Sequence, residues 1–263
     1  MLEASYGRSR LPKAMNYQSR RWPQKGKAKY APPAPENSLV ISLDDALEAG
    51  GRAALADNQL DLLRGPSSGR RVPLFVAGDT SLFSLPSVSI VGTREVSEEG
   101  AARARRLARE LCQAGVAIVS GLAKGVDTAA HTSAINSGGR TIAVIGTPLS
   151  KAYPAENAAL QEQIYSAHLL VSPFSEGEAV FKSNFPKRNR VMAAISDATV
   201  IIEASDTSGT LHQAAECQRL GRWLFITKVV AEDPSLEWPK RFIGKPKVGV
   251  LRETSDIIAA ING

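Results

Sequence analysis

Short apolar runs alternate with longer amphipathic stretches from about residue 88 onward. Six of these runs are rich in β-branched residues and too apolar for half-exposed strands, so each is expected to be a buried strand of a parallel sheet. The stretches between them carry apolar positions at helical spacing and predict helices. The expected strands are 88–92, 116–121, 141–146, 169–172, 199–204 and 223–227, and the expected helices are about 98–114, 127–137, 156–166, 188–196 and 209–220.

This alternation predicts an α/β fold, with a Rossmann-like, doubly wound and mostly parallel sheet and helices on both faces. Right-handed crossovers bring the carboxyl ends of the strands to one edge of such a sheet, where open α/β sheets bind their ligands. An apolar run upstream, VPLFVAGD at 72–79, is expected to add an edge strand.

The N-terminal part of the chain lacks this periodicity. The stretch APPAPENS at 31–38 has too many prolines for a helix and is interpreted as a linker. After it, Ser42 is expected to cap a short helical lead-in that is interrupted at Gly50 and Gly51. The predicted organisation is a basic, disordered tail at 1–35, a linker and helical lead-in at 36–80, a Rossmann-like core at 81–230, and a C-terminal extension at 231–263 that ends in a helix over SDIIAAI.

The positive charge is concentrated in the tail. The chain has 263 residues and a net charge of +6. Residues 1–35 contain eight Lys and Arg against Glu3 alone, a net +7, which leaves a net −1 for the rest of the chain. Composition leaves two interpretations of the tail open, a nonspecific phosphate-binding arm and a solubilising disordered segment. A nucleic-acid site on the folded body depends instead on local placement of charge.

Several classes of protein are disfavoured. No run approaches the roughly 18 apolar residues of a membrane span and no apolar signal segment is visible, so a cytoplasmic location is expected. The chain has no GxGxxG after the first strand and no GxxxxGK[ST], which argues against an NAD enzyme or a P-loop ATPase. Cys112 and Cys217 are expected to be buried free thiols, and His131, His168 and His212 lack ligand spacing, so neither a metal nor a cofactor is expected.

Glycine and hydroxyl residues gather where the expected strands end. The loops read VGTREVSEEG, SGLAKGVDTAAH, IGTPLSKAYPAEN, FPKRNR and EASDTSGTLHQAA. Four of the five lie beside a helix start, where backbone N–H groups favour a phosphate. One such loop is usually only a turn and a helix cap, but several on one sheet edge indicate a ligand site. Asp127 stands at a helix start, and an N-cap role is favoured for it.

Together with GGRTIAVIG and FPKRNRVMAAIS, these loops resemble the core of the Smf/DprA family of DNA-processing proteins, over about residues 85–230. The resemblance implies a Rossmann-like core that binds single-stranded DNA without catalytic turnover and without a cofactor. It further implies a homodimer and a RecA-type recombinase as partner during recombination or uptake of transforming DNA.

The resemblance also implies a set of DNA-binding residues. Arg94 corresponds to a phosphate clamp, and Phe185 to a base-stacking side chain whose alternative is a place in the core. Lys187, Arg188 and Arg190 correspond to phosphate contacts, although at least one of the two arginines is expected to serve only as an anchor of the helix start. The implied site is Gly92, Thr93, Arg94, Ser120, Gly121, Lys124, Phe185, Lys187, Arg188, Asn189, Arg190, Ser208, Gly209 and Thr210.

The chain departs from the family pattern on one side of this site. His212 and Gln213 replace the usual threonine and alanine, and ITKVV at 226–230 replaces a Pro-Gly ending. These changes put the far wall of the site in doubt. Two alternatives on the same fold stay open, a sensor of a small nucleotide ligand and a phosphoribohydrolase-like enzyme. The second rests on a partial match of SDTSGTLHQAAE to the PGGxGTxxE segment of such enzymes, in which Ser208 replaces the required glycine. The row of cations Lys187, Arg188 and Arg190 distinguishes DNA from a small nucleotide as the ligand. A polymer needs a charged track that leads out of the pocket, whereas a mononucleotide needs only an enclosed cradle.

Overall fold

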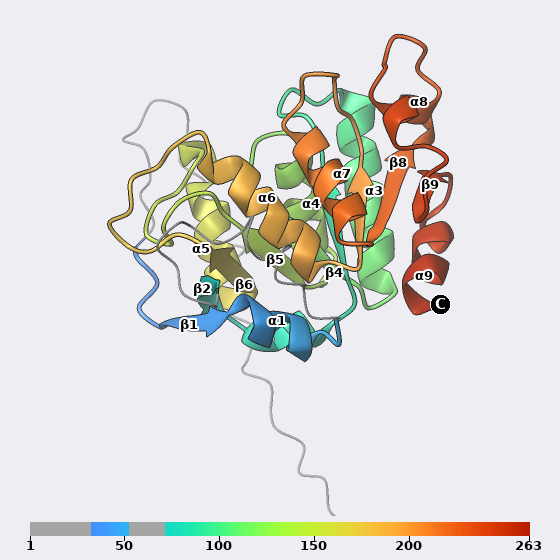
Figure 1. The fold of residues 1–263 in the computed structure, drawn as a ribbon. Helices are drawn as coiled ribbons and strands as arrows, with labels where there is room; N and C mark the ends of the chain where they lie inside the picture. Colours follow the sequence, from blue (N-terminus) through green and yellow to red (C-terminus); the bar gives the residue numbers. More distant parts are fainter. Residues whose placement is uncertain (1–32, 53–71) are drawn as a thin grey trace, which may run out of the picture.

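The structure, a computed structural model, describes residues 33–52 and 72–263. The strands of these residues form one sheet in the order β1-β2-β6-β5-β4-β3-β7-β8-β9 (Figure 1). Only β2 runs in the direction opposite to the other strands, so the mostly parallel α/β sheet is confirmed. The strands are β1 (Ser38–Ser42), β2 (Pro73–Gly78), β3 (Ser87–Val91), β4 (Ala117–Ser120), β5 (Thr141–Val144), β6 (Leu169–Ser172), β7 (Ala198–Ile201), β8 (Trp223–Thr227) and β9 (Val248–Leu251).

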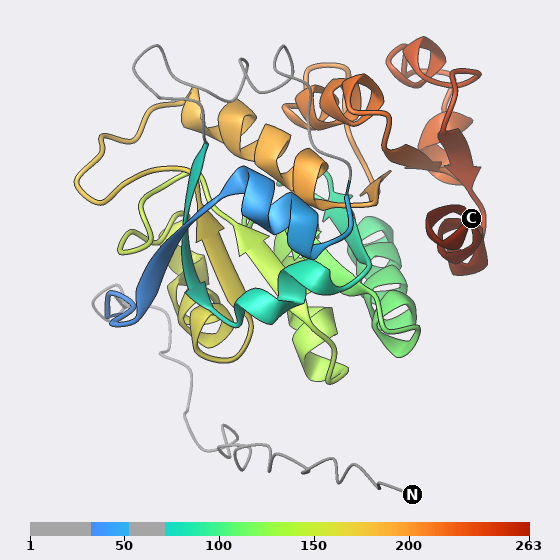
Figure 2. The same cartoon turned by 60° about the horizontal axis from the view of Figure 1, so that its bottom comes forward.

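Helices cover both faces of the sheet, as Figures 1 and 2 show from two directions. One face carries α1 (Leu43–Ala49), α6 (Asn184–Ile195) and α7 (Thr210–Arg219). The other carries α3 (Glu98–Gln113), α4 (Val126–Asn136), α5 (Ala158–Ala167) and α9 (Thr254–Asn262). Short helical turns complete the described part, namely α8 (Lys228–Ala231), η2 (Thr80–Ser84), η3 (Ala155–Asn157) and η4 (Pro239–Arg241). The doubly wound arrangement is confirmed.

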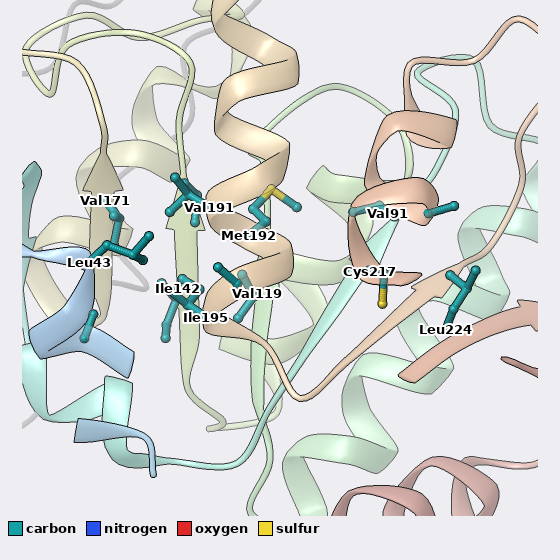
Figure 3. Close-up of a cluster of buried hydrophobic side chains, with 14 of the residues drawn as sticks. Leu43, Val91, Val119, Ile142, Val171, Val191, Met192, Ile195, Cys217 and Leu224 are labelled. Atoms are coloured by element: carbon teal, nitrogen blue, oxygen red, sulfur yellow. The ribbon is translucent and has the colours of Figure 1, made fainter. Parts of the chain in front are cut away.

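The sheet has a hydrophobic core on each face. The strands contribute side chains to both cores, because neighbouring residues of a strand point to opposite faces. In β4, Val119 packs in the cluster beneath α6, whereas Ile118 packs in the cluster beneath α3 and α4. Figure 3 shows the first cluster, with Val119 near Met192 and Ile195 of α6. Fully burying an aliphatic side chain of this kind contributes about 1.5–3 kcal/mol. The two clusters fix the strands from both faces, so the loops that follow begin at fixed points.

The helical lead-in begins as the sequence predicts. The Ser42 hydroxyl accepts a hydrogen bond from the Asp45 backbone N–H at 3.1 Å, and the Asp45 carboxylate accepts one from the Ser42 N–H at 3.0 Å. This reciprocal capping box starts α1, which ends before Gly50. The expected continuation beyond residue 52, and the basic tail up to residue 32, lie outside the described residues.

The prediction at one margin of the sheet was wrong. The strand expected over 72–79 is present as β2, but β1 pairs along its outer side, so β2 is not the edge. The start of β1, Ser38, was expected in the linker, whereas the strand starts three residues after the last proline of that stretch, Pro35. At the other margin, β9 was not predicted, because the four residues VGVL carry too little pattern on their own and gain their backbone partners only by pairing with β8.

No helix within residues 33–52 and 72–263 is long and apolar enough to cross a membrane. Across the same residues, no group of three or more His, Cys, Asp and Glu side chains could hold a metal ion. Both cysteines are free, Cys217 buried and Cys112 partly so. Burial raises the pKa of the Cys112 thiol to about 11 and that of Cys217 to about 12, so both remain protonated at neutral pH.

Candidate nucleic-acid interface

A cavity of about 330 Å³ lies at the carboxyl edge of the sheet beside β3. Strand β3 is the point at which the winding reverses, since β4 to β6 lie on one side of it and β7 to β9 on the other. The crossover after β3 leads to β4 on one side and the crossover after β7 leads to β8 on the other, and this divergence opens a crevice between their loops. Nine of the predicted site residues line the cavity: Gly92, Thr93, Arg94, Phe185, Arg188, Asn189, Ser208, Gly209 and Thr210.

The other five predicted residues lie outside that lining. Ser120 is fully buried, and its hydroxyl donates to the Ile90 carbonyl at 2.7 Å. The Lys124 ammonium lies 2.8 Å from Glu156 at the surface. Lys187 is exposed on α6, Gly121 is buried, and Arg190 is half-buried with its Nε 4.0 Å from the Glu216 carboxylate. The structure therefore gathers the predicted residues of the loops after β3 and β7 around the cavity and leaves those of the loop after β4 outside its lining. It distributes the cations of the FPKRNR segment among different environments.

Arg188 is the buried anchor of this region. Its guanidinium Nη1 donates to the carbonyls of Gly121 and Val144, the latter at 2.9 Å, and its Nε donates to the Asn189 side chain at 2.9 Å. The two carbonyls lie at the ends of β4 and β5, so one side chain ties α6 to both strands. Burial lowers the pKa of Arg188, and the nearby Asp127 carboxylate opposes that shift. These hydrogen bonds anchor α6 to the sheet.

Asp127 does not cap α4, contrary to the sequence prediction. The N-cap residue is Gly125, and Asp127 lies in the first turn. Its carboxylate accepts hydrogen bonds from the backbone N–H groups of Gly121 and Ala123, both at 3.2 Å. The side chain therefore folds back onto the loop that precedes its helix. Burial raises the pKa of Asp127, and the positive charge of Arg188 opposes that effect.

Two glycines of an expected phosphate loop make room for other parts of the protein. A Cβ on Gly121 would lie 1.7 Å from Nη1 of Arg188, so the missing side chain makes room for the guanidinium. Gly125 has φ +78, and a Cβ there would lie 2.5 Å from the Thr93 carbonyl oxygen and 2.6 Å from that of Arg94. Only glycine adopts this conformation at little cost. The loop after β4 can therefore press against the loop that carries Arg94.

Arg94 and Phe185 lie side by side in the cavity wall, Arg94 exposed and Phe185 half-buried. The guanidinium carbon of Arg94 lies 5.6 Å from the centroid of the Phe185 ring, within the range of a cation–π contact. The Phe185 ring is half-buried and packs against the backbone at Gly146, where a Cβ would lie 2.9 Å from the ring. Tyr153 lies on the same ring, with a centroid separation of 5.3 Å. The residue predicted to stack on a base therefore has Arg94, Tyr153 and Gly146 around its ring and is only partly exposed.

The loop after β7 forms the far wall, and the C-terminal extension holds it in place. The buried Trp238 donates from its indole N–H to the Ala204 carbonyl at 2.9 Å. The Asp206 carboxylate accepts from the backbone N–H groups of Trp238 at 2.7 Å and Glu237 at 3.1 Å. Ser208 closes the loop, since its hydroxyl donates to that of Thr210 at 2.9 Å. Within this clamp, Trp238 follows the segment ITKVV at 226–230, in which the sequence departs from the family pattern.

Several lining residues were not predicted from the sequence. Met192 follows Phe185, Arg188 and Asn189 at helical spacing, so the 3.6-residue period of α6 identifies it once its neighbours are known. Gln213, predicted only as a departure from the family pattern, is fully buried at the cavity, whereas His212 is exposed. Asp127, predicted as a helix cap, and Pro186, part of the FPKRNR motif, also line the cavity. No local signal identifies the remaining lining residues Val91, Glu95, Ala123 and Ser205, apart from their adjacency to the motifs.

Sequence comparison relates this chain to DNA-processing proteins. Residues 67–262 match the family model described as DNA recombination-mediator protein A. DNA processing protein DprA of Streptococcus pneumoniae is 42% identical over 154 residues, which cover 59% of this chain and 54% of that protein. DprA of Bacillus subtilis is 34% identical over 171 residues, 65% of this chain and 58% of that protein. The chain thus spans a little over half the length of these two relatives.

Solved structures agree with this relationship. DprA of Streptococcus pneumoniae superposes with a TM-score of 0.69 and 32% identity, covering 86% of this chain and 75% of that one. DprA of Helicobacter pylori superposes with a TM-score of 0.66 and 27% identity, covering 80% and 94%, and its structure is described as showing that protein's single-stranded DNA binding mode. With the family model matching most of the chain, the resemblance is confirmed: this chain belongs to the DNA recombination-mediator protein A family, which includes the proteins called DprA and Smf.

Proposed function

We propose that this chain binds single-stranded DNA at the cavity beside β3 and breaks no bond in it. The observation that carries the proposal is the Arg94 guanidinium carbon, 5.6 Å from the centroid of the partly exposed Phe185 ring. A cation and an aromatic face at this distance suit the phosphate and the base of one nucleotide. The single-stranded DNA binding named for the Helicobacter pylori relative supports the same ligand.

In this proposal the predicted residues divide into contacts and supports. Phe185 stacks on a base, Arg94 and Lys187 neutralise phosphates, and the loops at 92–93 and 208–210 donate from their backbone and hydroxyl groups. Asn189, which also lines the cavity, contributes polar contacts. Lys124 and Arg190 contribute less than Arg94, because Glu156 and Glu216 already offset their charge. Ser120, Gly121 and Arg188 act by holding the strand ends in register.

Family membership extends the proposal to partners. The family description, a DNA recombination-mediator protein, supports transfer of the bound strand to a RecA-type recombinase, and we include a homodimer on the same basis. A strand-exchange reaction with such a recombinase, with and without this protein, tests the first of these. The mass of the purified protein in solution tests the second.

A free nucleotide is the second candidate ligand. The cavity volume lies at the lower end of the range for small-molecule pockets, about 300–1,000 Å³, and the burial of Arg188 shortens the cationic track. Binding of short single strands, duplexes and free nucleotides at two salt concentrations separates the candidates. Tight binding to a free nucleotide alone would overturn the proposal. The phosphoribohydrolase-like alternative gains no support, since Glu216 pairs with Arg219 instead of facing the cavity.

Alanine at Arg94 or at Lys187 is expected to weaken single-strand binding by about 1–3 kcal/mol and to lower the salt slope by roughly 0.7 for each phosphate that the variant no longer neutralises. Phe185→Ala is expected to weaken binding by a similar amount with little change in salt slope, because stacking releases no counterions. Fluorescence anisotropy of a labelled oligonucleotide across a salt series measures both quantities.

Two controls accompany these substitutions. Arg106→Ala removes one positive charge from the exposed surface of α3 and is expected to leave affinity almost unchanged. Phe185→Leu retains apolar packing at Gly146 but lacks the aromatic face, so thermal melting of both Phe185 variants separates a stacking defect from a folding defect. Normal DNA binding by a folded Phe185→Ala protein removes Phe185 from the site.

The purified protein is expected neither to cut DNA nor to hydrolyse ATP. The cavity contains no pair of nucleophile and base among its described lining residues, and the sequence contains no P-loop. Nuclease and ATPase assays on wild type and on Arg94→Ala check this expectation. An activity that disappears in the Arg94→Ala protein contradicts it, whereas a contaminating enzyme survives that change.

A further inference from the structure

An aromatic side chain extends the row formed by Arg94 and Phe185. Tyr153 follows β5, and its ring centroid lies 5.3 Å from that of Phe185 with the two planes inclined at 47°. Phe185 lines the cavity, whereas Tyr153 lies beyond the lining residues and is 46% exposed. The two rings therefore form a continuous aromatic surface from the cavity toward solvent.

The loop that carries Tyr153 is held by hydrogen bonds on both sides of the turn. The Thr147 hydroxyl donates to the Lys151 carbonyl at 2.6 Å, and the Ser172 hydroxyl donates to the Thr147 carbonyl at 2.7 Å. The Ser150 hydroxyl donates to the Glu176 carboxylate at 2.5 Å, which joins the loop to the one after β6. The backbone just before Tyr153 is therefore held in place, so little of its ordering entropy remains to be lost when a ligand binds.

Single exposed aromatic residues are ordinary features of protein surfaces, so exposure alone assigns no role to Tyr153. What distinguishes Tyr153 is its contact with the cavity's own aromatic ring together with the charges around both. Lys151 lies two residues before Tyr153 and Lys187 two residues after Phe185, and both are exposed. Exposed cations beside a row of aromatic faces are the arrangement with which proteins bind a single strand.

The spacing of the rings suits consecutive nucleotides. Neighbouring bases of a stacked strand are about 3.4 Å apart, and unstacked bases are further apart, so a separation of 5.3 Å between two rings is on the scale of one nucleotide step. We propose that Tyr153 is a second stacking platform, which holds the base next to the one on Phe185 and directs the strand out of the cavity. This inference rests on the proposed function and adds that the ligand spans at least two nucleotides.

The experiment compares wild type, Tyr153→Ala and Tyr153→Phe, with thymidine monophosphate and with a 15-nucleotide oligothymidylate as ligands. Tyr153→Ala is expected to lower affinity for the oligonucleotide by about 5- to 150-fold, the equivalent of one stacked base, with the salt slope unchanged. Tyr153→Phe retains the aromatic face and is expected to stay close to wild type. Affinity for the mononucleotide is expected to be the same in all three proteins.

Leu39→Ala is the matched control, since Leu39 is 57% exposed on β1 at the far margin of the sheet. Wild-type affinity for the oligonucleotide in a Tyr153→Ala protein with an unchanged melting temperature overturns the inference while leaving the proposed function intact. An equal drop in affinity for both ligands also overturns it, because Tyr153 then only positions Phe185. Absence of single-strand binding by the wild-type protein overturns the proposed function, and the inference with it.

Discussion

Replacing Arg188 with methionine is expected to lower the free energy of unfolding by about 3–5 kcal/mol, because it removes one member of a buried, charged network. The substitution leaves the carbonyls of Gly121 and Val144 without the guanidinium donor and the Asp127 carboxylate without its nearby positive charge. Equilibrium unfolding in urea, followed by circular dichroism, measures the change.

A double-mutant cycle identifies the source of this effect. Asp127→Asn alone leaves the Arg188 charge without its partner, so it is also expected to destabilise, and the double variant is expected to be destabilised by less than the sum of the two single effects. Arg106→Met is the control, since Arg106 pairs with Glu110 on the surface of α3 and such pairs contribute about 0–1 kcal/mol. A destabilisation below about 1 kcal/mol for Arg188→Met would mean that Arg188 does not anchor the fold.

Replacing Trp238 with alanine is expected to cost about 3–5 kcal/mol of folding stability and to weaken single-strand binding. The side chain is fully buried, packs on Phe242 at a centroid separation of 6.0 Å, and donates to the Ala204 carbonyl immediately before the far wall of the cavity. The substitution removes the packing of the C-terminal extension against that wall. Urea unfolding and oligonucleotide binding on the same variant report the two effects.

Trp238→Phe separates packing from the hydrogen bond. Phenylalanine retains most of the apolar contact but leaves the Ala204 carbonyl without its donor, at a cost of about 1–3 kcal/mol. Trp223→Phe is the matched control, because Trp223 stacks on Phe225 in β8, away from the wall. If Trp238→Phe and Trp223→Phe bind single strands equally well, the C-terminal extension does not support the cavity.

Most of the core could be predicted from the sequence because its signals are local. The six buried strands and five helices expected after residue 88 are all present, with ends displaced by up to about four residues. Periodicity records which residues a strand or helix buries, and crossovers of fixed hand then bring the strand ends to one edge. The largest displacement concerns α6, which begins at Asn184 and so includes the FPKRNR segment instead of following it.

The roles of the site residues were harder to predict, since residue type does not reveal burial. Arg188 and Lys187 are neighbours in the same cationic run, yet one is buried beneath α6 and the other is exposed. Likewise, the glycine of SGLA suggested a phosphate, whereas Gly121 makes room for Arg188. Tyr153 and Trp238 lie on loops about 30 and 50 residues away from Phe185 in the chain. Helical and strand periodicity applies within one element, so it does not connect residues this far apart.

The amino-acid pattern alone accounts for the α/β class, the order of the core elements and the sheet edge that carries the polar loops, because each follows from periodicity over short windows and from the handedness of crossovers. Which loop residues face the cavity and which support it depends instead on packing between segments that are distant in the chain. The packing of α6 across the ends of β4 and β5 directs Arg188 inward, and the clamp at Trp238 sets the far wall. Such contacts join distant segments, so they arise only when the whole sheet has formed.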